Sequence, residues 1–401
     1  MKISVIGAGT IGTAIVQELC ERTDAVSKVQ VCDTRSRALQ ALHDRVDSSL
    51  LRSFQIDARD HSVLGPIIQG SDCVVSCVPP ELNPELAALC LDRGIHFCDL
   101  GGNDSIVQQE LNLDAQAREK SVWIVPNCGL APGLVNILCL YGVDQFDTVD
   151  AARLRVGDVP LHPEPPFNFR ISWSAERIID DYTNPALLIE DGNVKEVDPL
   201  SRDEAITFGE PFGEMEAFCT QGGLSTLTDA LSGRVQMLDH KTIRWPGHAH
   251  QMRFMMGLGF GRSQKIDVRT HLTYRDVLVR RLRNRLGGPH ADAVLMRVLI
   301  RGQKDGTDKT LVFEMVEQYD KESDFTAMMR STSIPTVATV CLIGQHQIPG
   351  GGASVPENVV PREDYYAELA DRGLNISMQW YDGHVEVTDL ESLHASNAAS
   401  G

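Results

Sequence analysis

The chain has 401 residues, of which 37 are Lys or Arg and 55 are Asp or Glu, so its formal net charge is −18. This acidic balance excludes nucleic acid as an expected partner, because binding to a polyanion requires positive charge. Hydrophobic residues make up 42% and charged residues 23%, which is typical of a globular protein, and the length favours two or three domains. We find neither a long apolar segment nor a secretory leader pattern, so we expect no membrane span and no signal peptide.

Ten cysteines are scattered through mostly apolar segments. They lack the close paired spacing of a zinc site. We therefore expect reduced, buried thiols in a cytoplasmic protein.

Short β-like runs alternate with helical stretches over the first 130 residues, which is the βαβ pattern of a parallel, doubly wound sheet. The apolar run 122–125 is typical of a strand that is covered on both faces. Residues 1–130 are thus predicted to form an α/β dinucleotide-binding (Rossmann) domain, with a ligand crevice at the carboxyl ends of its strands. The expected strands are Ile3–Ile6, Val29–Cys32, Phe54–Asp57, Cys73–Cys77, His96–Leu100 and Val122–Pro126.

The pattern changes after residue 130 to longer loops and β-type stretches. Residues 131–330 are predicted to form a second, α+β domain on a mostly antiparallel sheet, with a hairpin turn at Lys304-Asp305-Gly306. Residues 331–393, including a helix over 332–344, are predicted to return to the first domain. The small, polar tail 394–401 is expected to be disordered.

A glycine motif follows the expected first strand and precedes an apolar-faced helix. In Gly7-Ala8-Gly9-Thr10-Ile11-Gly12 the first glycine permits a tight turn, the second allows close approach to a pyrophosphate, and the third allows close helix packing. The helix N-terminus adds N–H groups and a positive dipole. The motif predicts dinucleotide binding by Gly7, Gly9, Thr10, Ile11 and Gly12, the alternative being a nucleotide-free turn of the same type.

Asp33 ends the expected second strand, 21 positions after Gly12. A carboxylate at this spacing accepts hydrogen bonds from the adenosine ribose and repels a 2′-phosphate, so Asp33 favours NAD. Arg35 and Arg37 lie close enough to keep NADP open, and a helix cap is the structural alternative for Asp33.

Two later strand ends are also expected near the cofactor. Pro79-Pro80 stiffens the first loop, and Gly101 lets the backbone approach closely in the second. The predicted contacts are Cys77, Val78, Pro79 and Gly101, with ordinary turn chemistry as the alternative.

Six segments in order along the chain resemble the saccharopine dehydrogenase-like family. They are Pro126–Asn136, His162–Pro166, Asp181–Ala186, Glu216–Phe218, Gly222–Leu227 and Lys241–His248. Within the family they look most like the lysine 6-dehydrogenases, which tend to carry an acidic residue where this chain has Asn127. The resemblance implies a Rossmann domain completed by C-terminal helices, an α+β catalytic domain, often a dimer, and a role in lysine degradation.

Substrate binding is predicted in the second domain. Arg244 is a fork-shaped cation that can hold an α-carboxylate with two hydrogen bonds, and the resemblance implies this role because it matches the carboxylate-binding arginine of saccharopine reductases. A strand arginine paired with a local carboxylate is the alternative. Thr242, Gly223 and Ser225 are the other expected substrate contacts, although the glycine segment also fits a turn entering a capped helix.

Hydride leaves a carbon that bears nitrogen only when the nitrogen lone pair is free, so a base is needed. The candidates are Asp99, Tyr182, His240 and His248, and we expect His248 to sit on a turn facing the cleft. His248 and His250 are expected to alternate across a strand with no third ligand, which argues against a metal.

The sequence therefore predicts an enzyme that uses NAD to deaminate the side-chain amine of L-lysine or a close analogue. The products would be the aldehyde or its cyclic imine, ammonia and NADH. The alternatives are a saccharopine- or opine-type dehydrogenase acting on a secondary amine, and a non-catalytic NAD-sensing module. We expect a small amino-acid substrate, a homodimer, and no nucleic-acid or membrane partner.

Overall fold

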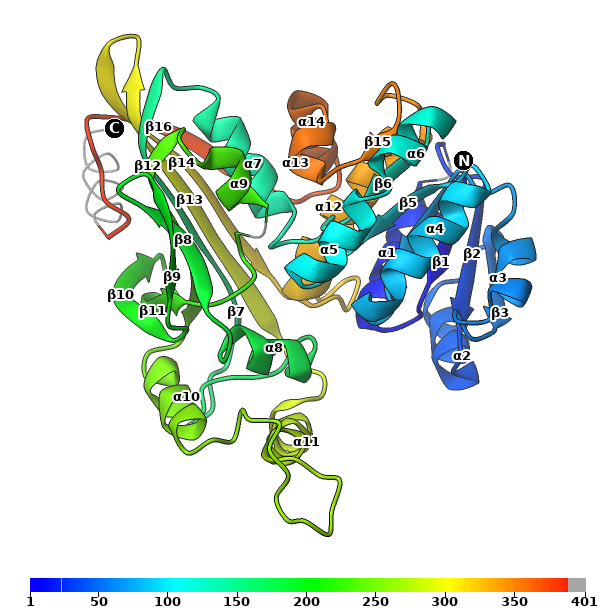
Figure 1. The fold of residues 1–401 in the computed structure, drawn as a ribbon, viewed down its shortest axis with the longest axis horizontal. Helices are drawn as coiled ribbons and strands as arrows, with labels where there is room; N and C mark the ends of the chain where they lie inside the picture. Colours follow the sequence, from blue (N-terminus) through cyan, green and yellow to red (C-terminus); the bar gives the residue numbers. More distant parts are fainter. Residues whose placement is uncertain (23, 225, 389–401) are drawn as a thin grey trace. The chain divides into compact units, whose positions relative to one another are not determined.

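The computed structural model describes residues 1–22, 24–224 and 226–388, which form two compact units. Unit 1 comprises Met1–Ile137 and Met329–Asn375, and unit 2 comprises Leu138–Met328 and the described residues from Ile376 onward. Figure 1 shows unit 1 in blue and cyan with orange C-terminal helices, and unit 2 mostly in green and yellow. Ser225 and the predicted tail 394–401 lie outside the described residues.

Unit 1 contains a seven-stranded sheet with the order β15-β6-β5-β4-β1-β2-β3, and every neighbouring pair is parallel. Six of these strands follow the Rossmann order. The strands are β1 (Lys2–Ile6), β2 (Lys28–Asp33), β3 (Leu51–Gln55), β4 (Cys73–Ser76), β5 (His96–Asp99), β6 (Trp123–Val125) and β15 (Gly352–Ala353). The predicted doubly wound parallel sheet is confirmed.

Helices connect the parallel strands, as parallel crossovers require. They are α1 (Thr10–Glu21), α2 (Ser36–Arg45), α3 (His61–Ile68), the 3-10 turn η1 (Pro80–Leu82), α4 (Asn83–Asp92), α5 (Asp104–Leu111) and α6 (Asp114–Lys120), followed later in the chain by α13 (Pro356–Val359) and α14 (Arg362–Asp371). Asp60 caps α3 by accepting hydrogen bonds from the N–H groups of Ser62 and Val63. The chain passes between the units within α7 (Leu134–Val143) and α12 (Ala327–Gly344).

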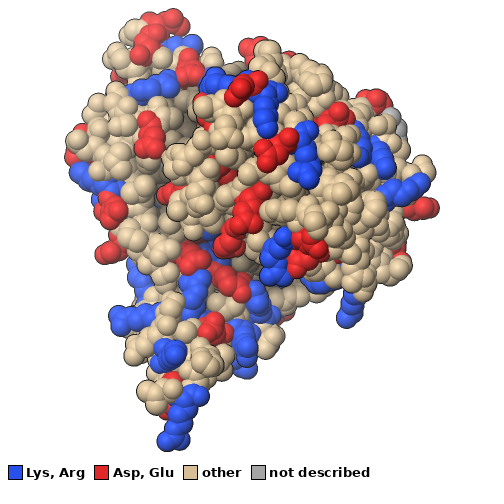
Figure 2. Space-filling view, turned by 45° about the vertical axis from the view of Figure 1, so that its right-hand side comes forward, with Lys and Arg blue, Asp and Glu red and all other residues tan. Residues whose placement is uncertain are grey.

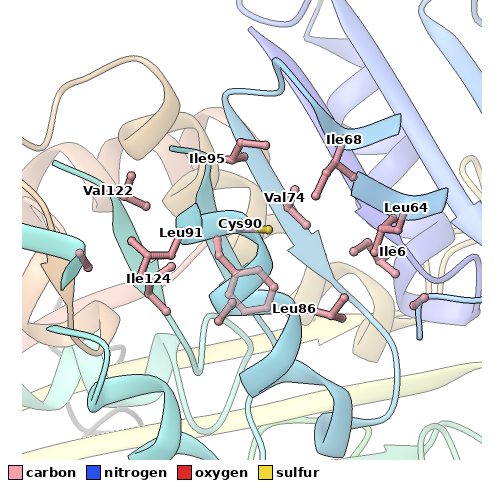
Figure 3. Close-up of a cluster of buried hydrophobic side chains, with 14 of the residues drawn as sticks. Ile6, Leu64, Ile68, Val74, Leu86, Cys90, Leu91, Ile95, Val122 and Ile124 are labelled. Atoms are coloured by element: carbon pink, nitrogen blue, oxygen red, sulfur yellow. The ribbon is translucent and has the colours of Figure 1, made fainter. Parts of the chain in front are cut away.

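The core of unit 1 includes a cluster between the sheet and three of its helices. Leu64 of α3 and Cys90 of α4 pack with Ile6, Val74 and Ile124 from the strands (Figure 3). All five side chains are almost fully excluded from solvent, so the strands are apolar on a face that a helix covers. This packing fixes the strand ends, where the candidate site lies.

Unit 2 is built on a nine-stranded sheet with the main order β10-β11-β12-β7-β13-β14-β16, and β8 pairs with both β12 and β9. The strands are β7 (Thr148–Pro160), β8 (Ala186–Glu190), β9 (Asn193–Val197), β10 (Ser201–Phe208), β11 (Gly213–Cys219), β12 (Val235–Arg244), β13 (Asp292–Lys304), β14 (Thr307–Gln318) and β16 (Ser377–Asp382). All strand pairs are antiparallel except β7 with β12. The predicted mostly antiparallel sheet is confirmed.

The helices that lie wholly within the described residues of unit 2 are α8 (Ala175–Asp181), α9 (Leu227–Leu231), α10 (His248–Gly257) and α11 (Tyr274–Leu286). Strands β13 and β14 form the predicted hairpin, and its two turn residues, Asp305 and Gly306, have φ angles of 52° and 70°. These positive values are those of a type I′ turn, which matches the twist of a hairpin.

The C-terminal segment differs in part from the predicted return of residues 331–393 to the first domain. Its helices belong to unit 1, but the chain from Ile376 onward belongs to unit 2. The physical reason is the pairing of β16 with β14 over six residues, which adds an edge strand to the second sheet. Across the described chain, no helix combines the length and the apolar character needed to cross a bilayer.

Candidate functional site

A pocket of about 450 Å³ lies at the carboxyl ends of the central strands of unit 1. The lining comes from the segments that follow β1, β2, β3 and β4, and these ends meet at one edge of a parallel sheet. The predicted residues Gly7, Gly9, Asp33, Cys77, Val78 and Pro79 line it. Thr10, Ile11 and Gly12 lie instead at the start of α1, and Gly101 lies after β5.

Each glycine of the motif meets a different steric requirement. Gly7 has a φ of +107°, and a Cβ there would come within 2.7 Å of the Cys77 carbonyl oxygen. A Cβ on Gly12 would lie 2.0 Å from the Gly7 carbonyl oxygen, so only glycine lets α1 approach the strand this closely. Gly9 has no atom within 4 Å of its Cβ direction, which leaves its backbone accessible to a ligand.

Asp33 lies on the pocket wall with its carboxylate already engaged. It accepts hydrogen bonds from the backbone N–H groups of Ala8 (2.8 Å) and Arg35 (2.8 Å) and pairs with the Arg35 guanidinium at 3.1 Å. Burial alone would raise the pKa of Asp33, but the side-chain and backbone hydrogen bonds from Arg35 and Ala8 outweigh it and hold the pKa below its usual value. Asp33 is therefore charged at neutral pH.

A second carboxylate–guanidinium pair, Asp57 with Arg59, lines the same pocket at an N–O distance of 2.5 Å. The hydrogen bonds from Arg59 lower the pKa of Asp57 to about 2. We did not single out this pair from the sequence. The available signal is its position at the carboxyl end of the expected strand Phe54–Asp57, because such ends gather at one sheet edge.

Asp99, a predicted base, ends β5 and is fully buried. Its Oδ1 accepts hydrogen bonds from the N–H groups of Gly101 (2.6 Å) and Asn127 (3.2 Å), whereas its Oδ2 and both oxygens of the buried Glu110 find no donor among the described residues. Burial raises the pKa of both carboxyl groups, and their mutual proximity raises that of Glu110 further. The Asp99–Glu110 pair therefore shares a proton inside unit 1. Asp99 is not among the residues that line the pocket.

Arg244, the predicted carboxylate ligand, lies at the end of β12 in unit 2 and is 4% exposed. Its Nη1 lies 3.1 Å from the Asp158 carboxylate and donates to the Asp158 carbonyl oxygen, while its Nε donates to the Tyr182 hydroxyl at 3.3 Å. Within the described part of the chain, Nη2 is assigned no hydrogen bond. One edge of the guanidinium is thus structural, and the other is available to a ligand.

His248 differs from its expected place on a turn facing a cleft. It is the first residue of α10 and is 1% exposed, because its ring packs between aromatic rings: the Phe169 centroid lies 4.5 Å away and Phe218 stacks on it at 6.1 Å. Its Nε2 lies 3.0 Å from the Tyr182 hydroxyl. Burial, assisted by the charge of Arg244, holds the pKa of His248 well below its usual value, so the ring is neutral. His250 lies on the same helix rather than on the strand expected for this pair.

His240 and Thr242 precede Arg244 on the same face of β12, since side chains alternate along a strand. Thr242 shares a 2.7 Å hydrogen bond with Thr220. Burial lowers the pKa of His240 to about 4, and neither ring nitrogen has a partner in the described structure. A Cβ on Gly223 would lie 2.2 Å from the His240 ring, so the loop around Gly223 packs directly on this face. Ser225, the remaining predicted contact, is outside the described residues.

These placements bring Arg244, Tyr182 and His248 into one hydrogen-bonded group and set His240 and Thr242 beside them along β12. The group combines a buried guanidinium, which Asp158 pairs on one side, with neutral aromatic rings. In such a low-dielectric setting a guanidinium attracts a carboxylate more strongly than it does in water. The arrangement can therefore hold the carboxylate of an amino acid.

Two family models match consecutive parts of the chain. Residues 3–125 match the saccharopine dehydrogenase NADP binding domain, and residues 129–374 match the saccharopine dehydrogenase C-terminal domain. Together they cover both units.

Among curated proteins, the mitochondrial alpha-aminoadipic semialdehyde synthases of Rattus norvegicus and Mus musculus are each 20% identical over 202 residues. The matched region is 49% of this chain and 21% of each synthase, so about half of this chain matches about a fifth of each relative.

Two solved structures share the fold. Saccharopine dehydrogenase (L-Glu forming) from Saccharomyces cerevisiae matches with a TM-score of 0.78 at 16% identity, covering 95% of this chain and 99% of that one. Homospermidine synthase from Legionella pneumophila, solved with NAD, matches with a TM-score of 0.69 at 14% identity, covering 95% and 91%.

Proposed function

Because the chain belongs to the saccharopine dehydrogenase family, we propose that it is an NAD-dependent dehydrogenase of the side-chain amine of lysine or a close analogue. Its products would be the aldehyde or the cyclic imine derived from it, ammonia and NADH. The observation that carries the proposal is the guanidinium of Arg244, which is buried beside aromatic rings and whose Nη2 has no hydrogen-bond partner among the described residues.

The choice of NAD rests on the charge balance of the pocket wall. Arg35 and Arg59 are largely exposed there, but each is paired with a carboxylate, Asp33 or Asp57. The two carboxylates and the two guanidinium groups on this wall therefore have a net charge of zero. A 2′-phosphate would meet two carboxylates that stay ionised at neutral pH, whereas the hydroxyl group of NAD meets no such repulsion.

The residues of unit 2 have separate tasks in this proposal. Nη2 of Arg244 would donate to the substrate carboxylate, while Asp158 and Tyr182 hold the guanidinium in place from its other side. Phe169, whose ring centroid lies 5.2 Å from the Arg244 guanidinium carbon, would exclude water from that contact. Nicotinamide, when bound, supplies the acceptor for the hydride that leaves the carbon beside the amine.

Membership of the family also favours a second candidate, a saccharopine-type reaction at a secondary amine. That substrate would carry the same kind of carboxylate, so Arg244 would serve it equally well. The two candidates differ in the nitrogen product, because only a primary amine yields ammonia.

A substrate panel tests the proposal. Purified protein is incubated with NAD or NADP and single amino acids that differ in side-chain length, and reduced cofactor is followed by its absorbance. We expect reduction of NAD with lysine or its near homologues. Reduction only with saccharopine, or oxidation of NADH only with lysine and a keto acid together, would support the second candidate instead.

For assembly we propose a homodimer that uses the lobe formed by residues 248–287. This lobe exposes Phe254, Leu258 and Val268 at 63%, 60% and 95%. Residues 253–285 carry nine Lys or Arg against two Asp or Glu in a chain of net charge −18. The lobe forms the lower end of the molecule in Figure 2, where blue Lys and Arg side chains predominate. Because the chain as a whole is acidic, a second copy of it is a partner whose charge complements this basic lobe.

A further inference from the structure

Asp181 is the last residue of helix α8, which Figure 1 labels. It precedes Tyr182, whose hydroxyl group contacts Arg244. Its side chain is half-buried, and its carboxylate forms no hydrogen bond or ion pair with the described residues. The neighbouring Asp180, in contrast, pairs with Arg275 at 2.8 Å. A carboxylate held near the protein interior without a donor costs free energy, so its presence here points to a role other than stabilising the fold.

The surroundings of Asp181 place it beside the Arg244 group. A Cβ on Gly222 would lie 3.4 Å from Oδ1 of Asp181, and the N–H of Gln221 donates to the Asp181 carbonyl oxygen at 3.2 Å. The next residue along that loop, Gly223, packs on the His240 ring. The carboxylate thus borders the same loop that covers the polar face of β12.

The protonation behaviour of Asp181 also sets it apart from the other candidates. Burial raises its pKa to about 7, against the opposing effect of Arg177 and Arg244, while Asp180 adds to the rise. Burial lowers the pKa values of His240 and His248 and raises that of Tyr182. Near neutral pH the two histidines are therefore weak bases, and the tyrosine keeps its proton.

We propose that Asp181 is the base that takes the proton from the substrate ammonium group. The proposal rests on the proposed function and assigns its missing proton acceptor. The ammonium N–H bond breaks, its proton binds a carboxylate oxygen of Asp181, and the lone pair stays on nitrogen. That lone pair then forms the C=N bond as the adjacent carbon passes a hydride to oxidised nicotinamide. The substrate loses two electrons as it becomes the iminium ion, and the cofactor gains them with the hydride.

The test compares the pH dependence of kcat/KM for lysine in the wild-type protein, Asp181→Asn and Asp180→Asn. In the wild type we expect kcat/KM to rise with pH through about 7, as Asp181 loses its proton. Asp181→Asn should lower kcat by roughly 100-fold or more and abolish this rise, since general-base catalysis contributes about that factor. Asp180→Asn should keep the rise. Asp181→Glu retains a carboxylate and should recover part of kcat with a shifted profile.

The outcomes separate the two proposals. If the wild type oxidises lysine and Asp181→Asn keeps both its rate and its pH profile, the assignment of Asp181 is overturned while the function stands. If no amine is oxidised by the wild type, both fall together. Melting temperatures of all variants show whether a loss reflects unfolding. If Asp181→Asn does not fold, an unchanged profile in Asp181→Glu would count against the assignment.

Discussion

The carboxylate of Asp33 has two partners that the sequence spacing alone could not reveal. The hydrogen bond that it accepts from the Ala8 N–H ties the glycine loop to the end of β2, and its ion pair neutralises Arg35 on the pocket wall. Asp33 therefore affects cofactor choice in two ways, by its own charge and by masking that of Arg35.

Replacing Asp33 with Ala should reduce the preference for NAD over NADP by about 10- to 100-fold. The change removes repulsion and frees Arg35 to donate to a 2′-phosphate, a charged hydrogen bond of about 1.5–3 kcal/mol. Steady-state kinetics with both cofactors measures the ratio. The double variant Asp33→Ala/Arg35→Ala should lose most of the gain with NADP. An unchanged ratio in the single variant would show that the adenosine ribose binds elsewhere.

Asp99 and Glu110 form a buried carboxyl pair, and keeping this pair protonated makes the stability of the fold depend on pH. Folding raises the pKa of Glu110 above its ordinary 4.5. Above that pH Glu110 ionises more readily in the unfolded chain than in the folded one, which lowers the free energy of unfolding. Stability should therefore fall as the pH rises above about 5.

The variant Glu110→Gln should remove much of this pH dependence. The glutamine amide can donate to Asp99 at every pH. The free energy of unfolding of the variant, taken relative to that of the wild type, should therefore rise by about 1–3 kcal/mol between about pH 5 and pH 8. Urea unfolding at both pH values measures the change. Glu119→Gln, at an exposed position on α6, serves as the control and should track the wild type. If Glu110→Gln loses the same stability at both pH values, the pair holds no proton.

At the scale of single elements, β12 presents different chemistry on its two faces. His240, Thr242 and Arg244 share one face, while Asp239 and Lys241 on the other join a buried ion network with Arg155. The second network has its charges paired internally. On the other face Arg244 pairs with Asp158, but its Nη2 has no hydrogen-bond partner in the described part of the chain.

Two buried arginines on opposite faces of this sheet allow a matched comparison. Arg244→Lys should lower kcat/KM for lysine by about 10-fold or more, the effect of losing a hydrogen bond of roughly 1.5–3 kcal/mol to a charged group, and should also lower Tm. Arg297→Lys breaks contacts to Glu314 and should lower Tm alone. Equal kinetic losses in both variants would indicate that Arg244 acts only through stability.

The elements themselves were largely predictable. Strand and helix positions in unit 1 follow from apolar runs and the glycine motif, and the β13–β14 hairpin follows from Asp305-Gly306. Local patterns could not predict that β16 pairs with β14, because the partner strands are far apart in sequence. They also could not predict that His248 starts a helix inside an aromatic cluster, or that the Asp181 carboxylate has no hydrogen-bond donor among the described residues, since both depend on tertiary packing.

At the scale of the whole molecule, the lobe of residues 248–287 makes assembly testable. Phe254→Asp together with Leu258→Asp should shift the protein from dimer to monomer in analytical ultracentrifugation, because both changes place charge in an apolar contact. High salt should also weaken the wild-type dimer, since the lobe is basic. Val63→Asp alters an exposed apolar residue on α3 and should leave the dimer intact. A wild type that is monomeric at all concentrations contradicts this proposal.

The central claim is that the protein removes a primary amine from lysine or a close analogue and reduces NAD. The most direct measurement follows NADH by absorbance and ammonia by a separate assay in the same lysine reaction. The account predicts that the two products accumulate in equal amounts and that neither forms without NAD. Formation of NADH without ammonia, or no turnover with any amine, would contradict it.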